Sequence, residues 1–553
     1  MHNKSYIWAL SLIPSILIPE AVAVPQCARQ EMMALDSSPG GQVMGVALAS
    51  DSIGRLLVGA SLGTGNAWWT GAAHIFELSG TSWIRSHTLT ASNGQQFDNF
   101  GADVGLSGVW AIIGAPTSGP VEPGGAYMFR YNGAIWTESQ LLRPLSVQHD
   151  DSFGHSCALD GTTSVVGSPS GAGNVPETGE IYIFEWDGSA WGEVAHLWDP
   201  AGQFQDRFGL DVAIQGDWIV VGAHRDCTAG IQAGAIHFYR RVGGNWQFHS
   251  KVTAASPTPW QALGREVTIE GHRALASGGL TTLVFEFDGN SWIETAELVS
   301  VDVAQTGGIG IGSSLALDGS RAYIGAQGDD QSRGAVYVFE ESAGQWSHIA
   351  KLNSPDLEGG NGLGDAVSAS AGIVFAGARN RDNSPPFSDG SVLAFSLPNE
   401  FTPYCMNTTC PCSNTEPLYG CTNSTTTGSY LSACGTASVA ADDLILTAEN
   451  LPTSQWGIFY MGAGAIELPF GDGARCVGSG GVGTFRYAIQ LSDTGGTLQL
   501  GPGIAALSQQ RFSTPGHITA GDTWNFQAWF RDPGGPCGTA FNLSNAISIG
   551  FVP

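Results

Sequence analysis

Two acidic loops hold the residues whose types and spacing come closest to a metal site. Asp329 and Asp330 follow one predicted strand, and Asp382 and Asp389 follow the equivalent strand further along the chain. Carboxylate oxygens are the ligands that Ca²⁺ prefers, but the ion takes about six to eight oxygens, more than either loop offers. We therefore expect both loops to be solvated turns, with a bound metal ion as the alternative, and we predict no cofactor.

Trp68 and Trp69 are the candidate binding residues. Two adjacent tryptophans on a surface loop offer flat apolar faces that stack on sugar rings or anchor a protein partner. They lie outside the repeat pattern described below. The alternative interpretation is that both rings cover the neighbouring part of the fold. If the pair is exposed, the predicted partner is an extracellular protein or a glycan.

No arrangement of residues predicts catalysis. A Gly-x-Ser-x-Gly turn with a set of partner residues is not found. The densest histidine cluster, His224-Arg225-Asp226-Cys227, offers too few ligands for zinc. The pair Asp150-Asp151 could serve as the acid and base of a glycosidase. Asp151, however, belongs to a turn that recurs along the chain, which favours a structural role. We therefore predict that the protein is not an enzyme.

These candidates lie between short strands of a unit that recurs seven times. Each unit opens on a glycine, and these glycines are Gly45, Gly101, Gly154, Gly209, Gly264, Gly312 and Gly364. A tryptophan that follows a hairpin turn repeats in step with them, at Trp83, Trp136, Trp191, Trp246, Trp292 and Trp346. In the fourth unit, alternating apolar residues predict strands over 210–215, 218–222, 235–240 and 246–252. Four antiparallel strands per unit are typical of a propeller blade.

The two ends of the repeat region complete each other. The seventh unit lacks a fourth strand, and an apolar segment at 31–35 precedes the first unit as the fourth strands precede the later ones. Pairing the two would remove an exposed sheet edge. We therefore predict a closed seven-bladed β-propeller over residues 24–400, with the N-terminal segment in the last blade.

The repeated unit resembles the FG-GAP repeat of integrin alpha-subunit propellers. The likeness lies in the opening Phe-Gly and in Gly114-Ala115-Pro116 and Gly167-Ser168-Pro169 after the second strand. An Asp three residues before the opening Gly also recurs, at Asp98, Asp151 and Asp206. The resemblance implies a propeller that binds partners. It does not extend to the calcium sites of that family, because turns such as Leu159-Asp160-Gly161 hold too few oxygen ligands.

The first residues and the net charge of the chain predict where the protein is located. Residues 1–23 are typical of a secretory signal, with Lys4, an apolar core and a small-residue cleavage site. No later segment is long and apolar enough to span a bilayer. The 553 residues carry a formal net charge of −27, which argues against nucleic acid as the partner. We expect a secreted or cell-surface protein.

Residues 401–553 form a different module, which contains seven of the 10 cysteines. Disulfides are favoured over zinc, because no Cys-x-x-Cys pair is present and the chain is expected to be exported. Cys157 and Cys227, in neighbouring repeats, could also pair. Alternating apolar residues predict a β-sandwich-like domain. The phrases at 471–476 and 526–533 resemble a C-terminal module of exported proteins from planctomycete-like bacteria.

The predicted fold class is all-β, a seven-bladed β-propeller followed by a disulfide-containing β-sandwich-like domain. The predicted function is that of a secreted binding or adhesion propeller, which presents loops to a protein or glycan partner. Two alternatives are an extracellular polysaccharide-acting enzyme with a site shared by several blades, and a structural cell-envelope protein docked by its C-terminal module.

Overall fold

The computed structural model describes residues 27–32, 43–65, 68–79, 82–118, 122–148, 150–299, 311–354, 357–381, 389–396, 401–405, 410–414, 420–434, 437–440, 442 and 444–552. The regular structure of the described residues consists almost entirely of antiparallel strands, as predicted. The predicted signal at 1–23 lies outside the described residues.

Seven four-stranded antiparallel sheets make up the described repeat region, one for each repeat counted in the sequence. The first sheet holds β2 (Met44–Ser50), β3 (Arg55–Ala60), β4 (Ala72–Ser79) and β5 (Ser82–Leu89). The second holds β6 (Val104–Ser107), β7 (Trp110–Ser118), β8 (Glu122–Tyr131) and β9 (Trp136–Leu142). The third holds β10 (Ser156–Asp160), β11 (Thr163–Ser168), β12 (Glu180–Trp186) and β13 (Trp191–Leu197). The fourth holds β14 (Val212–Gln215), β15 (Trp218–Ala223), β16 (Ala235–Val242) and β17 (Asn245–Val252), close to the predicted bounds.

The remaining three sheets repeat this order. The fifth holds β18 (Val267–Glu270), β19 (Arg273–Gly278), β20 (Thr281–Phe287) and β21 (Trp292–Leu298). The sixth holds β22 (Ile311–Asp318), β23 (Arg321–Ala326), β24 (Ala335–Ser342) and β25 (Gln345–Leu352), with the short α2 (Asp329–Ser332) before β24. The seventh holds β26 (Leu363–Ser370), β27 (Ile373–Ala378), β28 (Ser391–Ser396) and β1 (Cys27–Met32).

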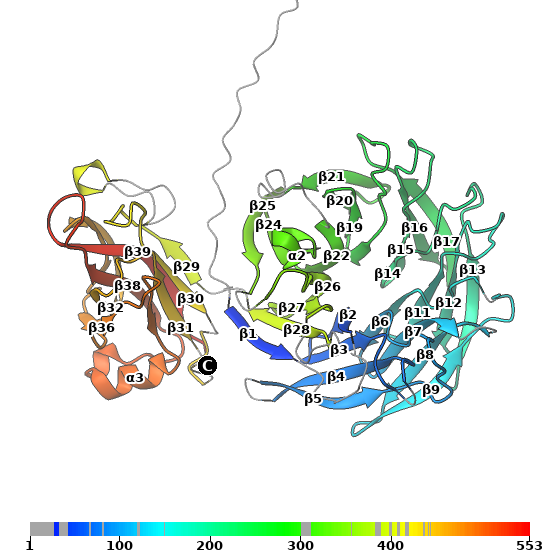
Figure 1. Cartoon of the computed structure of the whole chain (residues 1–553), viewed down its shortest axis with the longest axis horizontal. Helices are drawn as coiled ribbons and strands as arrows, with labels where there is room; N and C mark the ends of the chain where they lie inside the picture. The colour runs from blue at the N-terminus through cyan, green and yellow to red at the C-terminus, as the bar shows by residue number, and fades with distance from the viewer. Residues whose placement is uncertain are drawn as a thin grey trace, which may run out of the picture.

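The N-terminal strand β1 is the fourth strand of the seventh sheet. It pairs antiparallel with β28, with Met32 opposite Val392, and Figure 1 shows the two strands side by side. The strand begins and ends earlier in the chain than the predicted 31–35. Met32 is buried and packs in a cluster with Met44 and Phe375, so this end of the chain helps to fill the core next to the first sheet.

The core of the repeat region consists of separate clusters between neighbouring sheets. Seven such clusters are present among the described residues, and one of them joins residues of the seventh sheet to residues of the first. The repeated tryptophans pack in these clusters, as Trp136 and Trp191 show. These tryptophans therefore pack between neighbouring sheets, and the arrangement is consistent with a propeller.

The Phe-Gly and Gly-Ala phrases meet at the junctions between sheets. Gly154 donates its N–H to the carbonyl oxygen of Gly167 in its own sheet at 3.1 Å, and it faces Gly114 of the preceding sheet. A Cβ on Gly114 would overlap with the carbonyl oxygen of Gly154. Gly377 faces Gly45 in the same way, so the last sheet contacts the first through the same phrase. Glycine is required here because the two backbones touch.

The Asp that recurs before Phe-Gly shapes the loop that leads into the second, third and fourth sheets. The carboxylate of Asp98 accepts the N–H of Gln95 at 2.6 Å, and the N–H of Asp98 returns a bond to the carbonyl oxygen of Gln95 at 3.2 Å. Asp151 and Asp206 make the same pair of bonds to Gln148 and Gln203. The structural role predicted for Asp151 is therefore confirmed.

The C-terminal module is a β-sandwich-like domain. Its largest sheet runs in the order β29 (Phe401–Tyr404), β39 (Phe541–Gly550), β38 (Thr523–Arg531), β32 (Trp456–Gly462) and β35 (Thr484–Arg486), with β36 (Gln490–Leu491) also paired to β32. A second sheet holds β30 (Tyr430–Cys434), β31 (Ile445–Glu449) and β37 (Leu498–Leu500). The hairpin β33 (Gly464–Phe470) and β34 (Gly473–Gly478), the helix α3 (Ile504–Arg511) and the 3-10 turns η1 (Pro411–Ser413) and η2 (Thr514–Gly516) complete it.

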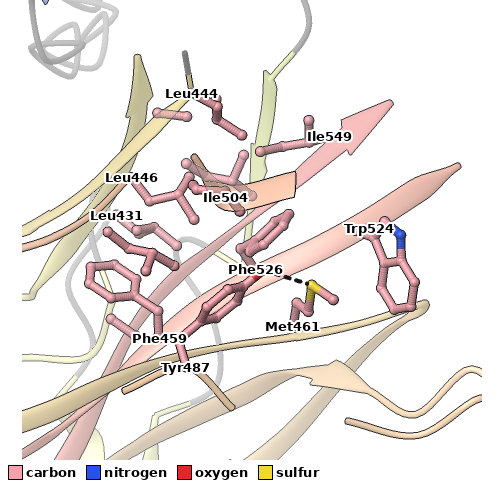
Figure 2. Packing of buried hydrophobic residues seen from close by; sticks show 14 of the residues in the cluster. Leu431, Leu444, Leu446, Phe459, Met461, Tyr487, Ile504, Trp524, Phe526 and Ile549 are labelled. Carbon is pink, nitrogen blue, oxygen red and sulfur yellow. Dashed lines mark hydrogen bonds between the residues drawn. The ribbon is translucent and has the colours of Figure 1, made fainter. Parts of the chain in front are cut away.

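The core of this module lies between the two sheets. Figure 2 shows Leu431 and Leu446 of the smaller sheet facing Phe459 and Phe526 of the larger one. Ile504 of α3 belongs to the same cluster. The hydroxyl of Tyr487 donates to the sulfur of Met461 at 3.3 Å across the cluster.

Three disulfides tie this module together: Cys405–Cys476, Cys410–Cys421 and Cys412–Cys537. The preference for disulfides over zinc is confirmed for these six cysteines. The suggestion that Cys157 pairs with Cys227 is wrong, because both are free thiols. Cys157 is buried in β10, whereas Cys227 is exposed in the loop after β15, so their places within the repeat keep them apart.

Candidate functional site

An exposed aromatic cluster lies where the loops of the first and second sheets meet. Trp68 and Trp69 come from the loop between β3 and β4, and Phe97 comes from the loop between β5 and β6. Trp68 is 57% exposed and Phe97 is 53% exposed. The rings of Trp69 and Phe97 lie 5.4 Å apart at an interplanar angle of 32°. We call Trp68, Trp69 and Phe97 the aromatic ledge.

The backbone that supports the ledge is a repeated junction. Phe97 donates its N–H to the carbonyl oxygen of Trp69 at 2.7 Å. Trp69 has a positive φ of 59°, and the residues two before the third-strand glycine in other sheets, Glu177, Gln232 and Ser332, share this conformation. The expectation that the tryptophan pair lies outside the repeat pattern is therefore wrong for the backbone of Trp69. Only the side chains distinguish this junction.

Polar groups border the ledge. The side-chain amide of Asn99 donates to the hydroxyl of Thr117 at 3.0 Å, and that hydroxyl donates to the carbonyl oxygen of Phe97 at 2.5 Å. Aromatic faces beside amide and hydroxyl groups suit a carbohydrate, because a sugar ring has an apolar face and a polar rim. Sequence reasoning missed Phe97. The signal was an aromatic three residues before Phe100, a position that Trp260 also occupies before Leu263.

In the acidic loop of the sixth sheet, Asp329 forms an ion pair with a lysine. The carboxylate of Asp329 contacts the ammonium of Lys351 at 2.7 Å and accepts the hydroxyl of Tyr337 at 2.8 Å. Burial alone would lower the pKa of Lys351, but the hydrogen bonds of Asp329 and Tyr337 outweigh burial, and the pKa is raised. Asp330 pairs with Arg333 at 2.9 Å.

The metal prediction for these loops stays a prediction. Asp389 belongs to the loop of the seventh sheet and accepts the N–H of Met44 through its main-chain oxygen, whereas Asp382 lies outside the described residues. Among the residues that the structure describes, no group of three or more His, Cys, Asp or Glu side chains is placed to hold a metal ion. Lys351 already supplies the positive charge that Asp329 requires.

The fourth sheet has a similar lysine site. The side chains of the predicted histidine cluster lie apart from one another in this sheet. Lys251 contacts the carboxylates of Asp226 at 2.5 Å and Asp199 at 3.0 Å. His224 instead lines the central cavity, and its pKa is lowered to about 4 by burial and by the nearby Arg225. Cys227 is exposed. The structure therefore does not bring His224, Asp226 and Cys227 into one site.

A cavity of about 840 Å³ lies at the centre of the repeat region, lined by the first strands of all seven sheets. Carboxyl groups gather in it. Burial raises the pKa of Asp103 to about 6, and burial together with the charges of Asp211 and Asp103 raises the pKa of Glu266 well above its usual value. Sequence reasoning missed these groups. The signal was an acidic residue two positions after the opening glycine in three repeats.

Two of these carboxyl groups join neighbouring sheets. Asp103 accepts the N–H of Cys157 in the third sheet at 2.6 Å and that of Val104 at 2.9 Å. Asp211 accepts the N–H of Val267 in the fifth sheet at 2.6 Å and that of Val212 at 2.9 Å. Carboxyl groups that hold protons near neutral pH can act as acids and bases. Here, both oxygens of each group are already bonded to the main chain, which indicates a role in assembling the sheets.

The comparison with known families confirms the resemblance. The FG-GAP repeat family matches residues 83–129, 136–184 and 191–239. Each matched segment begins at one of the repeated tryptophans and ends in the third strand of the next sheet. No curated protein matches the chain. In the described part of the chain, no helix has the length and apolar character needed to cross a membrane.

Proposed function

We propose that this chain, three of whose repeats match the FG-GAP repeat, is an extracellular, non-enzymatic binding protein. FG-GAP repeats suggest a binding or adhesion-type propeller. The three disulfides fit an oxidising, extracellular compartment. Secretion or display at the cell surface, which the first 23 residues predict, is part of the proposal.

The proposal includes a closed seven-bladed propeller. Its support is that every neighbouring pair of sheets shares a hydrophobic cluster, including the seventh and the first. A parallel bridge also joins Met44 to Gly390, as Gly71 is joined to Phe100 at another junction. A closed ring holds its loops on a rigid support, so side chains at a junction keep a fixed spacing without a partner.

The observation that carries the proposal is the aromatic ledge. Two large apolar side chains, Trp68 and Phe97, are more than half exposed on loops that bond to each other, whereas most of the repeated aromatic residues are buried between sheets. Trp69 and the backbone bond to Phe97 fix the spacing of the two loops. We propose that a glycan stacks on the ledge and bonds to the neighbouring amide and hydroxyl groups, with a protein surface as the other outcome of the test.

The test is binding of the full chain to a glycan array and to a panel of cell surfaces. The Trp68→Ala/Phe97→Ala variant should lose at least tenfold in affinity for any glycan that the unchanged chain binds. Phe204→Ala is the matched control, because Phe204 is 61% exposed on the corresponding loop of another repeat. Binding to cells but to no glycan would assign a protein partner. Unchanged binding by the double variant would refute the ledge as the site.

One observation favours the alternative of an enzyme acting on polysaccharide. The central cavity collects Asp103, Asp211 and Glu266 from three repeats, and each has a raised pKa. A panel of polysaccharides incubated with the chain would separate the two functions. Release of shorter sugars, abolished by Glu266→Gln, would support the enzyme. Glu266 is the informative position because its carboxylate is not tied to a neighbouring sheet as those of Asp103 and Asp211 are.

A further inference from the structure

A groove lies on the outer face of the largest sheet of the C-terminal module. Its volume is about 750 Å³, and its lining includes Trp456, Ile458, Ile489 and Trp529 together with Arg486 and Arg531. Trp456 is 54% exposed. The solvent face of an antiparallel sheet is normally polar. An apolar strip with two arginines therefore needs an explanation.

The pairing of β32 with β38 places these side chains together. Along β32, Phe459 and Met461 enter the core shown in Figure 2, so Trp456 and Ile458 belong to the opposite face. Along β38, Phe526, Ala528 and Phe530 enter the same core, which leaves Trp529 and Arg531 on the outer face. Ile458 and Trp529 are direct cross-strand partners.

A third strand, β35, contributes Arg486 to the groove. Arg486 of β35 lies opposite Tyr460 of β32, two residues along the strand from Ile458. Trp456 lies opposite Leu491 of β36. Trp529 contacts Phe541 on its other side, with ring centroids 5.7 Å apart, which supports the indole from the adjacent strand. The groove is therefore built on paired strands, and its width is fixed by the sheet.

The two guanidinium groups have no acidic partner within the described chain. Seven arginines of the repeat region do pair with carboxylates: Arg55, Arg207, Arg241, Arg273, Arg321, Arg333 and Arg379. In a chain with 49 acidic and 22 basic residues, partners are abundant. Because Arg486 and Arg531 line the same apolar groove, both guanidinium groups are available to bind the anionic groups of one ligand.

We propose that this groove binds an acidic polysaccharide. Pyranose rings stack on Trp456 and Trp529, while Arg486 and Arg531 bind carboxylate or sulfate groups of the sugar. The flat indole faces favour a sugar over a peptide. This site is independent of the aromatic ledge and takes a ligand of different charge.

The test uses the full chain with polygalacturonate, dextran sulfate and uncharged dextran as probes. The unchanged chain should bind at least one acidic polymer and bind dextran at least tenfold more weakly. Preference for polygalacturonate would assign carboxylate groups, and preference for dextran sulfate would assign sulfate groups. Binding should weaken as salt rises, since both arginine contacts are exposed to solvent. Equal binding of all three probes would overturn the role of the arginines.

Variants separate the groove from general charge effects. Arg486→Gln/Arg531→Gln and, separately, Trp456→Ala should each lower affinity for the acidic polymer at least tenfold. Arg511→Gln, the same charge change on exposed α3 of the same module, should leave it within twofold. Trp68→Ala/Phe97→Ala should also leave it unchanged, so failure here and failure at the ledge are distinguishable. Melting temperatures check that each variant is folded.

Three results would overturn the proposal. One is that neither acidic polymer binds the unchanged chain. Another is that Arg511→Gln weakens binding as much as the double arginine variant. The third is that the chain self-associates in solution and the Trp456→Ala variant does not, which would make the groove an interface between two copies.

Discussion

The pairing of Lys351 with Asp329 yields the sharpest stability prediction. Their side chains are 22% and 5% exposed, and the ammonium lies 2.7 Å from the carboxylate. Replacing Lys351 with Met leaves a nearly buried charge that keeps two neutral donors, the hydroxyl of Tyr337 and the N–H of Asp330, each at 2.8 Å. Breaking a fully buried pair costs about 3–5 kcal/mol. Because Lys351 is partly solvated, we expect a loss of about 2–3 kcal/mol in the free energy of unfolding.

The assay is urea unfolding of the full chain with its disulfides intact, following the transition of the repeat region. Arg333→Gln is the matched control, because the Arg333–Asp330 pair lies in the same loop and is 48% and 56% exposed. An exposed pair contributes about 0–1 kcal/mol. Asp329→Asn combined with Lys351→Met should recover about 1 kcal/mol or more of the loss, since no charge is then left buried.

Two outcomes would refute this reasoning. Lys351→Met could lower the free energy of unfolding as little as Arg333→Gln does, which would show that Asp329 is well solvated without its lysine. Alternatively, millimolar Ca²⁺ could raise the melting temperature of the unchanged chain and lose that effect in Asp329→Asn. The loop would then hold a metal ion in preference to the ion pair.

Three further predictions concern the assembly of the sheets. The pKa of Asp103 is raised from 3.8 to about 6 and that of Asp211 is raised further, chiefly by burial, so their contribution to stability is complete below the unfolded value and is lost as pH rises through the folded values; the melting temperature should fall between about pH 4 and about pH 8, and a flat profile would contradict this. Gly114→Ala should lower the free energy of unfolding by about 3 kcal/mol, because the added Cβ overlaps with a backbone oxygen that cannot move aside. Gly192→Ala, whose Cβ would meet open space, should leave the free energy of unfolding nearly unchanged. Equal urea midpoints for the two variants would contradict the role of Gly114 at the junction. Deleting residues 27–40 removes β1 and the buried Met32, so the repeat region should melt at a much lower temperature, and an unchanged value would show that β1 does not complete the seventh sheet.

The repeat architecture was predictable from sequence because its determinants are backbone contacts. Gly114 and Gly154 must be glycine where two sheets touch, so the positions of glycine report the phase of the repeat directly. The bonds made by Asp98 are local as well, spanning three residues. The strands, the structural role of Asp151 and the disulfide preference followed from such short-range patterns.

The candidate sites were less predictable because each depends on pairing between distant segments. Phe97 meets Trp69 only because adjacent repeats bond loop to loop. Trp456 and Trp529 share a face because β32 pairs with β38 across more than 60 residues of chain. The lysine partner of Asp329 had one usable signal: lysine is so rare here that Lys251 and Lys351, at matching places in two repeats, pointed to a specific role.

The central claim is that the aromatic ledge is the binding surface of the repeat region. The most direct measurement is a calorimetric titration of the full chain with the best glycan from the array, compared with Trp68→Ala/Phe97→Ala and with Phe204→Ala. The account predicts that the double variant weakens binding at least tenfold, or about 1.4 kcal/mol, while Phe204→Ala stays within twofold. Equal dissociation constants for all three proteins would contradict it.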